Sequence, residues 1–329
     1  MSTKQRVFSG VQPTGEMHIG TYLGAFRNWV RLQDEYDTIY CIVDQHAITV
    51  PQDPEELRRN RLAGAKVLFA TGIDPDRALV YAQSYVPQHA ELSWLLGVMT
   101  PMGVLNRMTQ YKDRLAQGAA PNLGLFSYPV LMAADILIHR ANLVPVGDDQ
   151  KQHLEMTRDL AERFNNRYGD IFPIPEPLIP ETAARVMSLA DPTAKMSKSD
   201  ANIRSRVGII DPPDVVVKRI KSAMTDSEPT VRYDPEHKAG ISNLLEIMSV
   251  CTDRSIDDLV AEFGDGGYGT FKLAVADALV ETLTPIRERY ETLDDGDVAK
   301  LLAAGAERAE SQAEHYMREV RTAIGLNKL

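Results

Sequence analysis

Cysteine and tryptophan are the scarcest residues of this 329-residue chain, with two of each. Two cysteines, Cys41 and Cys251, are too few for the disulfide framework of a small secreted domain. No group of cysteines and histidines in the sequence has the spacing of a zinc or iron–sulfur site. Cys41 lies in an apolar stretch and is expected to be a small buried side chain. We therefore expect a reduced cytoplasmic protein without a structural metal.

Long apolar runs are also absent. Hydrophobic residues make up 44% of the chain, which is enough for a large core, yet no stretch reaches the ~20 apolar residues that span a bilayer. The early basic residues Lys4 and Arg6 are not followed by an apolar run with a cleavage site, so no secretory signal peptide is expected. The sequence thus predicts a cytoplasmic location without a membrane anchor.

Positive charge is in short supply. The formal net charge is −10, and residues 201–329 carry 16 lysines and arginines against 23 aspartates and glutamates. Any nucleic-acid contact must therefore come from a local basic patch, because the overall field repels phosphate. The best candidate lies in residues 204–232, whose basic side chains are Arg204, Arg206, Lys218, Arg219, Lys221 and Arg232. Four acidic residues lie among them, so a solvated helix face of mixed charge is the alternative.

The first part of the chain alternates strand and helix patterns. Strands are predicted at residues 6–11, 38–43 and 78–83, and helices at residues 19–33 and 54–71. The second helix has well-marked ends, with Asp53 as its N-cap and Gly72 as its stop. This order of elements predicts an α/β fold with a doubly wound parallel sheet, which binds ligands at the carboxyl ends of its strands.

The pattern changes to helices alone after about residue 206. Before that point we expect helices at residues 90–98, 104–112 and 129–139, a short strand at 143–146 and a long helix ending near residue 168. After it we expect helices at residues 212–225, 241–250, 255–263, 270–290 and 294–324. The sequence therefore predicts a second domain that is all-helical.

Two segments far apart in the chain have the composition of phosphate-binding loops. Residues 13–20, Pro-Thr-Gly-Glu-Met-His-Ile-Gly, join the first strand to the first helix and present backbone N–H groups to an anion. Gly15 and Gly20 let the backbone bend and let a nucleotide come close, and His18 can donate to a phosphate oxygen. Residues 195–199, Lys-Met-Ser-Lys-Ser, place two ammonium groups on a short loop, which we call the lysine loop. Each segment alone is compatible with an ordinary turn, but together they suggest attack of a carboxylate on the α-phosphate of ATP.

Asp135 is the one charged residue in the apolar run at residues 130–137. Charged side chains are seldom buried without a partner. Asp135 is therefore either a core carboxylate satisfied by backbone donors or a group that serves a ligand.

The two phosphate-binding segments resemble the HIGH and KMSKS signatures of the class I aminoacyl-tRNA synthetases. Four further segments are similar to those of the bacterial, tryptophan-specific members: Ser-Gly-Val-Gln-Pro-Thr-Gly at residues 9–15, Val-Asp-Gln-His-Ala-Ile-Thr at 43–49, Met-Ala-Ala-Asp-Ile-Leu at 132–137 and Val-Gly-Asp-Asp-Gln-Lys-Gln-His at 146–153. The resemblance extends over essentially the whole chain. One departure is Thr21, where the family often has Asn or His. A hydroxyl can still donate to phosphate or ribose.

The resemblance implies a two-domain ligase. Residues 1–206 would form a Rossmann-like catalytic domain that binds ATP, with Mg²⁺, and L-tryptophan. Residues 207–329 would form a helical domain that binds the anticodon region of tRNA(Trp), with a last helix able to pack back on the catalytic domain. The resemblance also implies a homodimer, for which the apolar segment at residues 94–104 and the helix after Pro129 could supply the interface.

The same resemblance assigns site residues. Catalysis would involve His18, Thr21, Lys195 and Lys198. The ATP site would comprise Gln12, Pro13, Thr14, Gly20, Thr21, Gly147, Asp148, Asp149, Val186, Lys195, Met196, Ser197, Lys198 and Ser199. In the tryptophan site, Asp135 would accept from the indole N–H, while Tyr128 and Gln150 would hold the α-amino group. The ring would lie between Phe8, His46, Met132, Val144 and Val146.

Other functions remain open at this stage. A tyrosine-specific synthetase shares the fold and could use an Asp near the same position for the phenol. An ATP-dependent ligase such as pantothenate synthetase shares a His-Ile-Gly element but lacks the helical module. A nucleotide-binding paralogue without catalysis is a further alternative, against which both lysines and His18 are present.

Overall fold

A computed structural model describes residues 4–116, 118–147, 150–179, 185–198 and 200–327 of the chain. A parallel sheet is at its centre, with strand order β3-β2-β1-β4-β5. The strands are β1 (Arg6–Val11), β2 (Asp37–Ile42), β3 (Ala78–Ala82), β4 (Leu143–Pro145) and β5 (Glu176–Leu178). The sheet confirms the predicted α/β class, and the first four strands lie within one or two residues of the predicted positions.

Strand β5 was not predicted. Its three residues, Glu176, Pro177 and Leu178, pair with β4 at the edge of the sheet. Proline lacks the N–H that a central strand needs, but it is tolerated at an edge where only one side is paired. Because prolines lie in and beside β5, its residues do not show the sequence pattern by which a strand is predicted.

Helices lie between the strands, and two of the predicted ones are interrupted. The helix α4 (Pro54–Thr71) has the predicted bounds, with Asp53 accepting from Glu56 N and Gly72 in the left-handed region at φ 109°. The stretch predicted as one helix at residues 19–33 is instead α1 (Ile19–Thr21), a π-helical segment η1 (Tyr22–Phe26) and α2 (Arg27–Glu35). A π turn keeps the helical direction but changes the hydrogen-bond spacing, so residue periodicity does not show it.

The helices between β3 and β4 also differ from the prediction in detail. The predicted helix at residues 104–112 is two helices, α6 (Met102–Leu105) and α7 (Thr109–Ala116). The side chain of Gln152 accepts from the N–H of Thr109 and so holds the break between them. Helix α8 (Leu123–Leu137) starts six residues before its predicted start, because Asn122 caps it and Pro129 lies inside the helix instead of at its beginning. The remaining elements of this part are α3 (Asp44–Ala47), η2 (Gln83–Tyr85), α5 (Gln88–Gly97), α9 (Lys151–Tyr168) and η4 (Ile203–Ser205).

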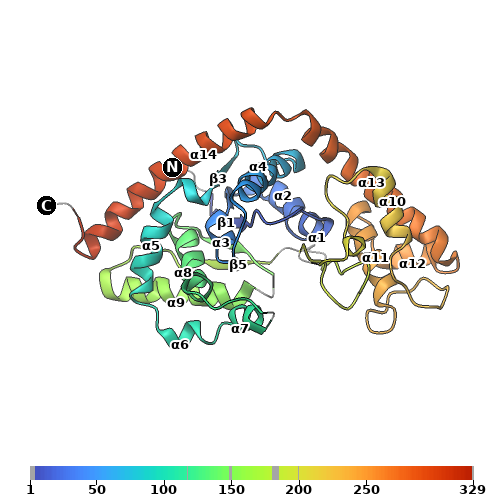
Figure 1. Cartoon of the computed structure of the whole chain (residues 1–329), viewed down its shortest axis with the longest axis horizontal. Coiled ribbons are helices and arrows are strands. Elements are labelled where there is room, and N and C mark those ends of the chain that lie inside the picture. Colours follow the sequence, from blue (N-terminus) through green and yellow to red (C-terminus); the bar gives the residue numbers. More distant parts are fainter. Residues whose placement is uncertain (1–3, 117, 148–149, 180–184, 199, 328–329) are drawn as a thin grey trace.

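Four helices form a module at one end of the molecule, on the right in Figure 1. They are α10 (Pro213–Lys221), α11 (Ala239–Thr252), α12 (Ile256–Phe263) and α13 (Gly267–Thr292). Their buried side chains, including Val216, Ile241 and Phe271, belong to the same hydrophobic cluster as Leu23 and Leu68 beside the sheet. The module therefore packs on the sheet part through a continuous apolar core.

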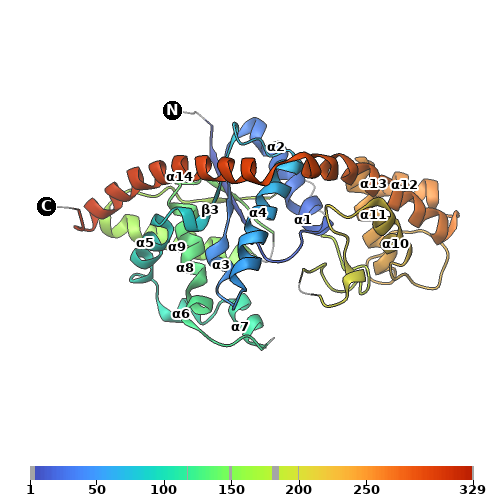
Figure 2. The same cartoon turned by 45° about the horizontal axis from the view of Figure 1, so that its top comes forward.

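The last helix, α14 (Asp295–Ala323), runs from this module back across the sheet part (Figures 1 and 2). It packs so closely on β3 that a Cβ added to Gly305 would lie 1.8 Å from the carbonyl oxygen of Val80. Ion pairs fix its far end, where Arg321 donates to Glu91 at 2.6 Å. Only glycine at position 305 permits this approach of two backbones.

Candidate active site

The turn between β1 and α1 (residues 12–18), which we call the glycine turn, lies at the carboxyl edge of the sheet. Gly15 has φ +63°, and a Cβ built on it would lie 3.8 Å from Cβ of Lys198. Pro13 is buried, Thr14 is half-buried and Gln12 is exposed. The backbone at Gly15 therefore lies directly against the lysine loop, although the two are more than 180 residues apart in sequence.

His18 stands at the N-cap of α1, with its side chain buried. Burial and the nearby charges of Lys198, Arg206 and Lys195 lower the pKa of His18 to about 4. The imidazole is therefore neutral at pH 7 and has one N–H to donate. Its Nδ1 has no hydrogen-bond partner among the described residues, and it would lie 3.0 Å from a Cβ added at Gly20.

Backbone bonds join the His18 segment to the chain that follows the lysine loop. The N–H of Ile19 donates to the carbonyl of Val207 at 2.9 Å, and the N–H of Ile209 donates to the carbonyl of Met17 at 2.9 Å. Arg206, which the sequence did not single out for this site, reaches the surroundings of His18 through this pairing. The two segments predicted to bind phosphate are thus held together through the chain at residues 207–209.

Lys198 is half-buried, and its ammonium donates to the carbonyl of Gln12 at 3.2 Å. Burial lowers the pKa of Lys198 to about 8. Lys195 is exposed, while Met196 is buried and donates its N–H to the carbonyl of Val186 at 3.1 Å. Val186 in turn lies beside Gly20, 3.5 Å from a Cβ added there.

Six of the predicted ATP-site residues therefore lie close together near His18. Gln12, Gly20, Val186, Lys195, Met196 and Lys198 are brought together by these contacts. Thr21 and Ser197 are half-buried within the same segments. Gly147 is exposed at the end of β4, where its carbonyl accepts from Gln150 N at 3.0 Å. Asp148, Asp149 and Ser199 lie outside the described residues.

Asp135, 1% exposed on α8, accepts hydrogen bonds from three side chains. Oδ2 accepts from His46 Nε2 at 2.8 Å, and Oδ1 accepts from Gln83 Nε2 at 2.6 Å and from His89 Nδ1 at 2.7 Å. Burial raises the pKa of Asp135, but the hydrogen bonds from His46 and His89 outweigh burial and lower the pKa to about 2. The carboxylate is therefore ionised, and Oδ2 keeps capacity to accept one more N–H.

A second layer of buried polar groups supports His89. The Tyr81 hydroxyl lies 2.8 Å from His89 Nε2 and 2.6 Å from His139 Nε2. Burial holds the pKa of His139 well below its usual range, so His139 is neutral, and its Nδ1 has no partner among the described residues. His89 therefore faces Asp135 through Nδ1, and the Tyr81 hydroxyl joins its Nε2 to His139 Nε2.

The sequence missed Gln83, His89 and Tyr81 as members of this cluster. Gln83 directly follows β3, and so occupies the same kind of strand end as His46 after β2. Because a doubly wound sheet binds ligands at the carboxyl ends of its strands, the position of Gln83 after β3 is a signal that could have found it. Nothing in the local sequence indicates His89, whose role depends on the packing of α5 against α8.

Four of the other predicted pocket residues lie in or against the apolar core that α8 shares with the sheet. Phe8 and Val144 belong to one buried hydrophobic cluster together with Val146, and Met132 packs against it. The ring of Tyr128 meets His46 edge-on, with centroids 6.2 Å apart, and its hydroxyl lies 2.8 Å from His153 Nε2. Gln150 is half-buried at the start of α9.

Among the described residues, no group of three or more His, Cys, Asp or Glu side chains is placed to hold a metal ion. No helix in the described part of the chain is both long and apolar enough to cross a membrane.

A glycine turn and a neutral histidine at the carboxyl edge of a parallel sheet, close to two lysines, suit the binding of a nucleotide's phosphates. The family model described as tRNA synthetases class I (W and Y) matches residues 2–284, and the chain belongs to this family.

Relatives within the family are similar to the chain over nearly its full length. The tryptophan–tRNA ligase of Caldanaerobacter subterraneus is 50% identical over 98% of this chain and 98% of its own. That of Corynebacterium glutamicum is 51% identical over 98% of this chain and 95% of its own. The crystal structure of tryptophanyl-tRNA synthetase from Campylobacter jejuni complexed with ADP and tryptophan matches with a TM-score of 0.84 at 37% identity, and covers 98% of this chain and all of that one. These similarities confirm the predicted fold and family.

Proposed function

We propose that the chain activates L-tryptophan with ATP to give tryptophanyl-AMP and pyrophosphate, and then transfers tryptophan to tRNA(Trp). The observation that carries this proposal is the near-full-length similarity to tryptophan–tRNA ligases reported above. An enzyme that acts on tRNA works where translation takes place, so we place the reaction in the cytoplasm. Mg²⁺ is expected to arrive with ATP, bound to its phosphate oxygens.

In the first step, a carboxylate oxygen of tryptophan attacks the α-phosphorus, and the bond to the bridging oxygen breaks as pyrophosphate leaves. The substrate is already a nucleophile, so the protein has to align it and stabilise the spreading negative charge. Neutral His18 would donate to a phosphate oxygen. Lys195 and Lys198 would follow the charge onto the pyrophosphate.

The ATP site would extend on both sides of these groups. Gln12, Pro13 and Thr14, together with Gly20 and Thr21, would line the nucleotide. Gly147, Asp148 and Asp149 would meet the ribose hydroxyls, and Val186 would pack near adenine. The loop residues Met196, Ser197 and Ser199 would complete the site.

Selection of tryptophan would depend on Asp135. The free acceptor capacity of its Oδ2 suits the indole N–H, and Phe8, His46, Met132, Val144 and Val146 would enclose the ring. Tyr128 and Gln150 would hold the α-amino group. A phenylalanine side chain has no donor for a buried carboxylate, so the site needs no editing domain to reject it.

ATP–pyrophosphate exchange measured with each of the twenty amino acids tests this function. Exchange that depends on tryptophan, with tyrosine and phenylalanine far weaker, is expected. Exchange that depends on tyrosine would establish the rival specificity. No exchange with any amino acid from folded protein would favour the paralogue without catalysis.

The helical domain, residues 207–329, is proposed to bind the anticodon region of the tRNA. Of the predicted basic patch, Arg219 pairs with Asp211 at 2.5 Å and donates to the carbonyl of Arg206, so it serves the fold. Arg204, Lys218 and Lys221 are exposed. These three side chains form the reduced patch that we propose for phosphate contacts.

Neutralising Lys218 and Lys221 together should weaken tRNA charging and leave tryptophan-dependent exchange unchanged. Two lost phosphate contacts should raise KM for tRNA about ten-fold and reduce the slope of log affinity against log salt by roughly one to two. Aminoacylation at several salt concentrations measures both. Lys300→Ala, which removes an exposed charge on α14, is the matched control. Normal charging by the double variant would exclude this patch from the tRNA interface.

We also propose that the enzyme is a homodimer. Trp94 on α5 is 74% exposed, with Val98 at 69% and Met102 at 64% beside it in sequence. Apolar side chains of this size, so exposed and so close in sequence, are typical of a surface that a partner covers. A second copy of the chain is the occupant we propose.

Placing charge on this surface should separate the subunits. Sedimentation velocity at micromolar concentration should give twice the chain mass of 36.6 kDa for the wild type and a single-chain mass for Trp94→Glu with Val98→Glu. Leu273→Glu, at an exposed apolar residue on α13, should leave the mass unchanged. A dimer that survives the double substitution would place the interface elsewhere.

A further inference from the structure

The base of the lysine loop is a short antiparallel ladder. Ser188 N donates to the carbonyl of Ala194 at 2.8 Å, and Met196 N donates to the carbonyl of Val186 at 3.1 Å, with Met187 opposite Lys195. In such a pair the central residues do not bond each other. The N–H and C=O of Met187 therefore point away from Lys195, toward the helical module.

Asn243 on α11 satisfies both of these groups. Its Oδ1 accepts from Met187 N at 2.8 Å, and its Nδ2 donates to the carbonyl of Met187 at 3.1 Å. The Asn243 side chain is 3% exposed, so water does not compete for the two bonds. One amide side chain thus takes the place of a third strand beside the ladder.

The start of α11 is itself fixed by a second contact with the loop base. Met224 N donates to the carbonyl of Leu189 at 2.8 Å. A Cβ added to Gly240 would lie 2.1 Å from the carbonyl oxygen of Met224, so the helix and the connector touch through their backbones. The helical module therefore bonds to the base of the lysine loop at two residues, Met187 and Leu189.

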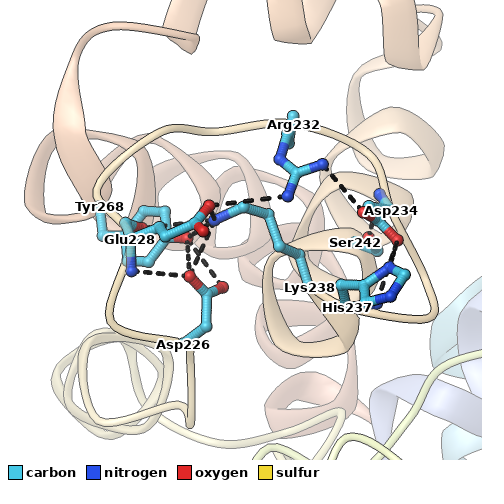
Figure 3. Close-up of polar contacts among 8 residues, drawn as sticks. All are labelled: Asp226, Glu228, Arg232, Asp234, His237, Lys238, Ser242 and Tyr268. Carbon is cyan, nitrogen blue, oxygen red and sulfur yellow. Dashed lines mark hydrogen bonds and ion pairs between the residues drawn. The ribbon is translucent and has the colours of Figure 1, made fainter.

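A buried lysine anchors the connector between α10 and α11 (Figure 3). Lys238 is 2% exposed, and its ammonium donates to Asp226 Oδ1 at 2.8 Å and to the Tyr268 hydroxyl at 2.7 Å. It also pairs with Glu228 at 3.1 Å, and Arg232 approaches the same carboxylate at 3.6 Å (Figure 3). These bonds link the connector and the start of α11 to α13, so Asn243 is mounted on a rigid support.

We propose that Asn243 is a positioning residue for adenylate formation: it fixes Met187, and through the ladder it places Lys195 and Lys198 against the glycine turn. The inference rests on the proposed function for its kinetic part. Asn243 lies on the far side of the ladder from Lys195, so it acts through the backbone. It also gives the helical module a direct mechanical connection to the loop that handles pyrophosphate.

Two measurements on Asn243→Ala test this. The kcat of tryptophan-dependent exchange should fall about ten-fold, while KM for tryptophan stays within two-fold. Trypsin cleavage after Lys195 and Lys198, followed by mass spectrometry without ATP, should become about ten-fold faster, because the loop base opens more often. The cleavage rate does not depend on activity, so it tests the clamp even if the wild type shows no exchange.

Asn165→Ala is the matched control. Asn165 also holds a backbone segment through its amide, accepting from Ile171 N and donating to the Phe172 carbonyl, but it does so on α9 in the sheet part. It should change neither kcat nor cleavage at the two lysines. If Asn243→Ala fails to fold, Asn243→Asp decides with the same readouts, since it keeps the shape and loses the donor. Wild-type kcat and cleavage in a folded Asn243 variant, or equal changes in Asn165→Ala, would overturn the proposal.

Discussion

Replacing Asp135 with Asn or Ala should abolish most tryptophan-dependent exchange and most of the discrimination against phenylalanine. The carboxylate accepts from His46, Gln83 and His89 and keeps one acceptor position on Oδ2. In Asp135→Asn, an amide N–H would face donors, and the charge that orients them is lost. We expect kcat/KM for tryptophan to fall on the order of 10³-fold. The preference over phenylalanine should drop from about 10⁴ to about 10² or less.

The ratio of the two substrates is the measurement that decides this prediction. A general loss of fold lowers exchange with every amino acid together, whereas loss of the acceptor changes the ratio. Thermal melting of each variant shows whether enough folded protein remains. Wild-type discrimination in folded Asp135→Ala would mean that the indole N–H is recognised elsewhere.

Asp135 should also contribute to acid stability. Its pKa is about 2 in the folded state against an ordinary value of 3.8, so the unfolded chain takes up a proton first as pH falls. The stabilisation, on the order of 2 kcal/mol, is present above pH 4 and is lost as pH falls from about 4 to 2. Between pH 6 and 9 the carboxylate does not titrate, so Asp135 adds no pH dependence to selectivity in the assay range.

The central fold could be predicted because each local signal had a physical cause. Alternation of buried strands and capped helices gave β1 and α4 their observed bounds, since Asp53 and Gly72 satisfy the ends of a helix by themselves. Strand β5 could not be predicted, because an edge strand containing Pro177 has no sequence pattern of its own. The break at η1 also has no local signature, since it depends on how Tyr22 and Phe26 pack in the core.

The site could be predicted only where a short run of residues has a recognisable composition. The glycine turn and the lysine loop each have one, so the family resemblance assigned both to one ATP site, and in the structure they meet at Gly15 and Lys198. The hydrogen-bond donors of Asp135 come from three different elements, and Asn243 comes from the helical module. A single sequence does not record which distant side chain will face a given carboxylate or peptide group.

Removing the charge of either loop lysine should lower kcat about 10²- to 10³-fold and change KM for tryptophan less than two-fold. Lys195 and Lys198 matter most when negative charge moves to the leaving pyrophosphate, so their loss affects the transition state more than the bound substrates. Pre-steady-state kinetics of Lys195→Ala and Lys198→Ala separate the two effects. A loss confined to tryptophan affinity would contradict the proposed role of the loop.

Lys198 should in addition make ATP use dependent on pH. Its pKa is about 8 before ATP binds, because the ammonium is partly removed from water. The charged form holds phosphate, so kcat/KM for ATP should fall as pH rises through about 8. Bound phosphates favour the charged form and raise that pKa, so kcat should stay level to higher pH than kcat/KM does. In Lys198→Arg the guanidinium does not titrate in this range, and the fall in kcat/KM near pH 8 should disappear. An unchanged pH profile in Lys198→Arg would assign the ionisation to another group.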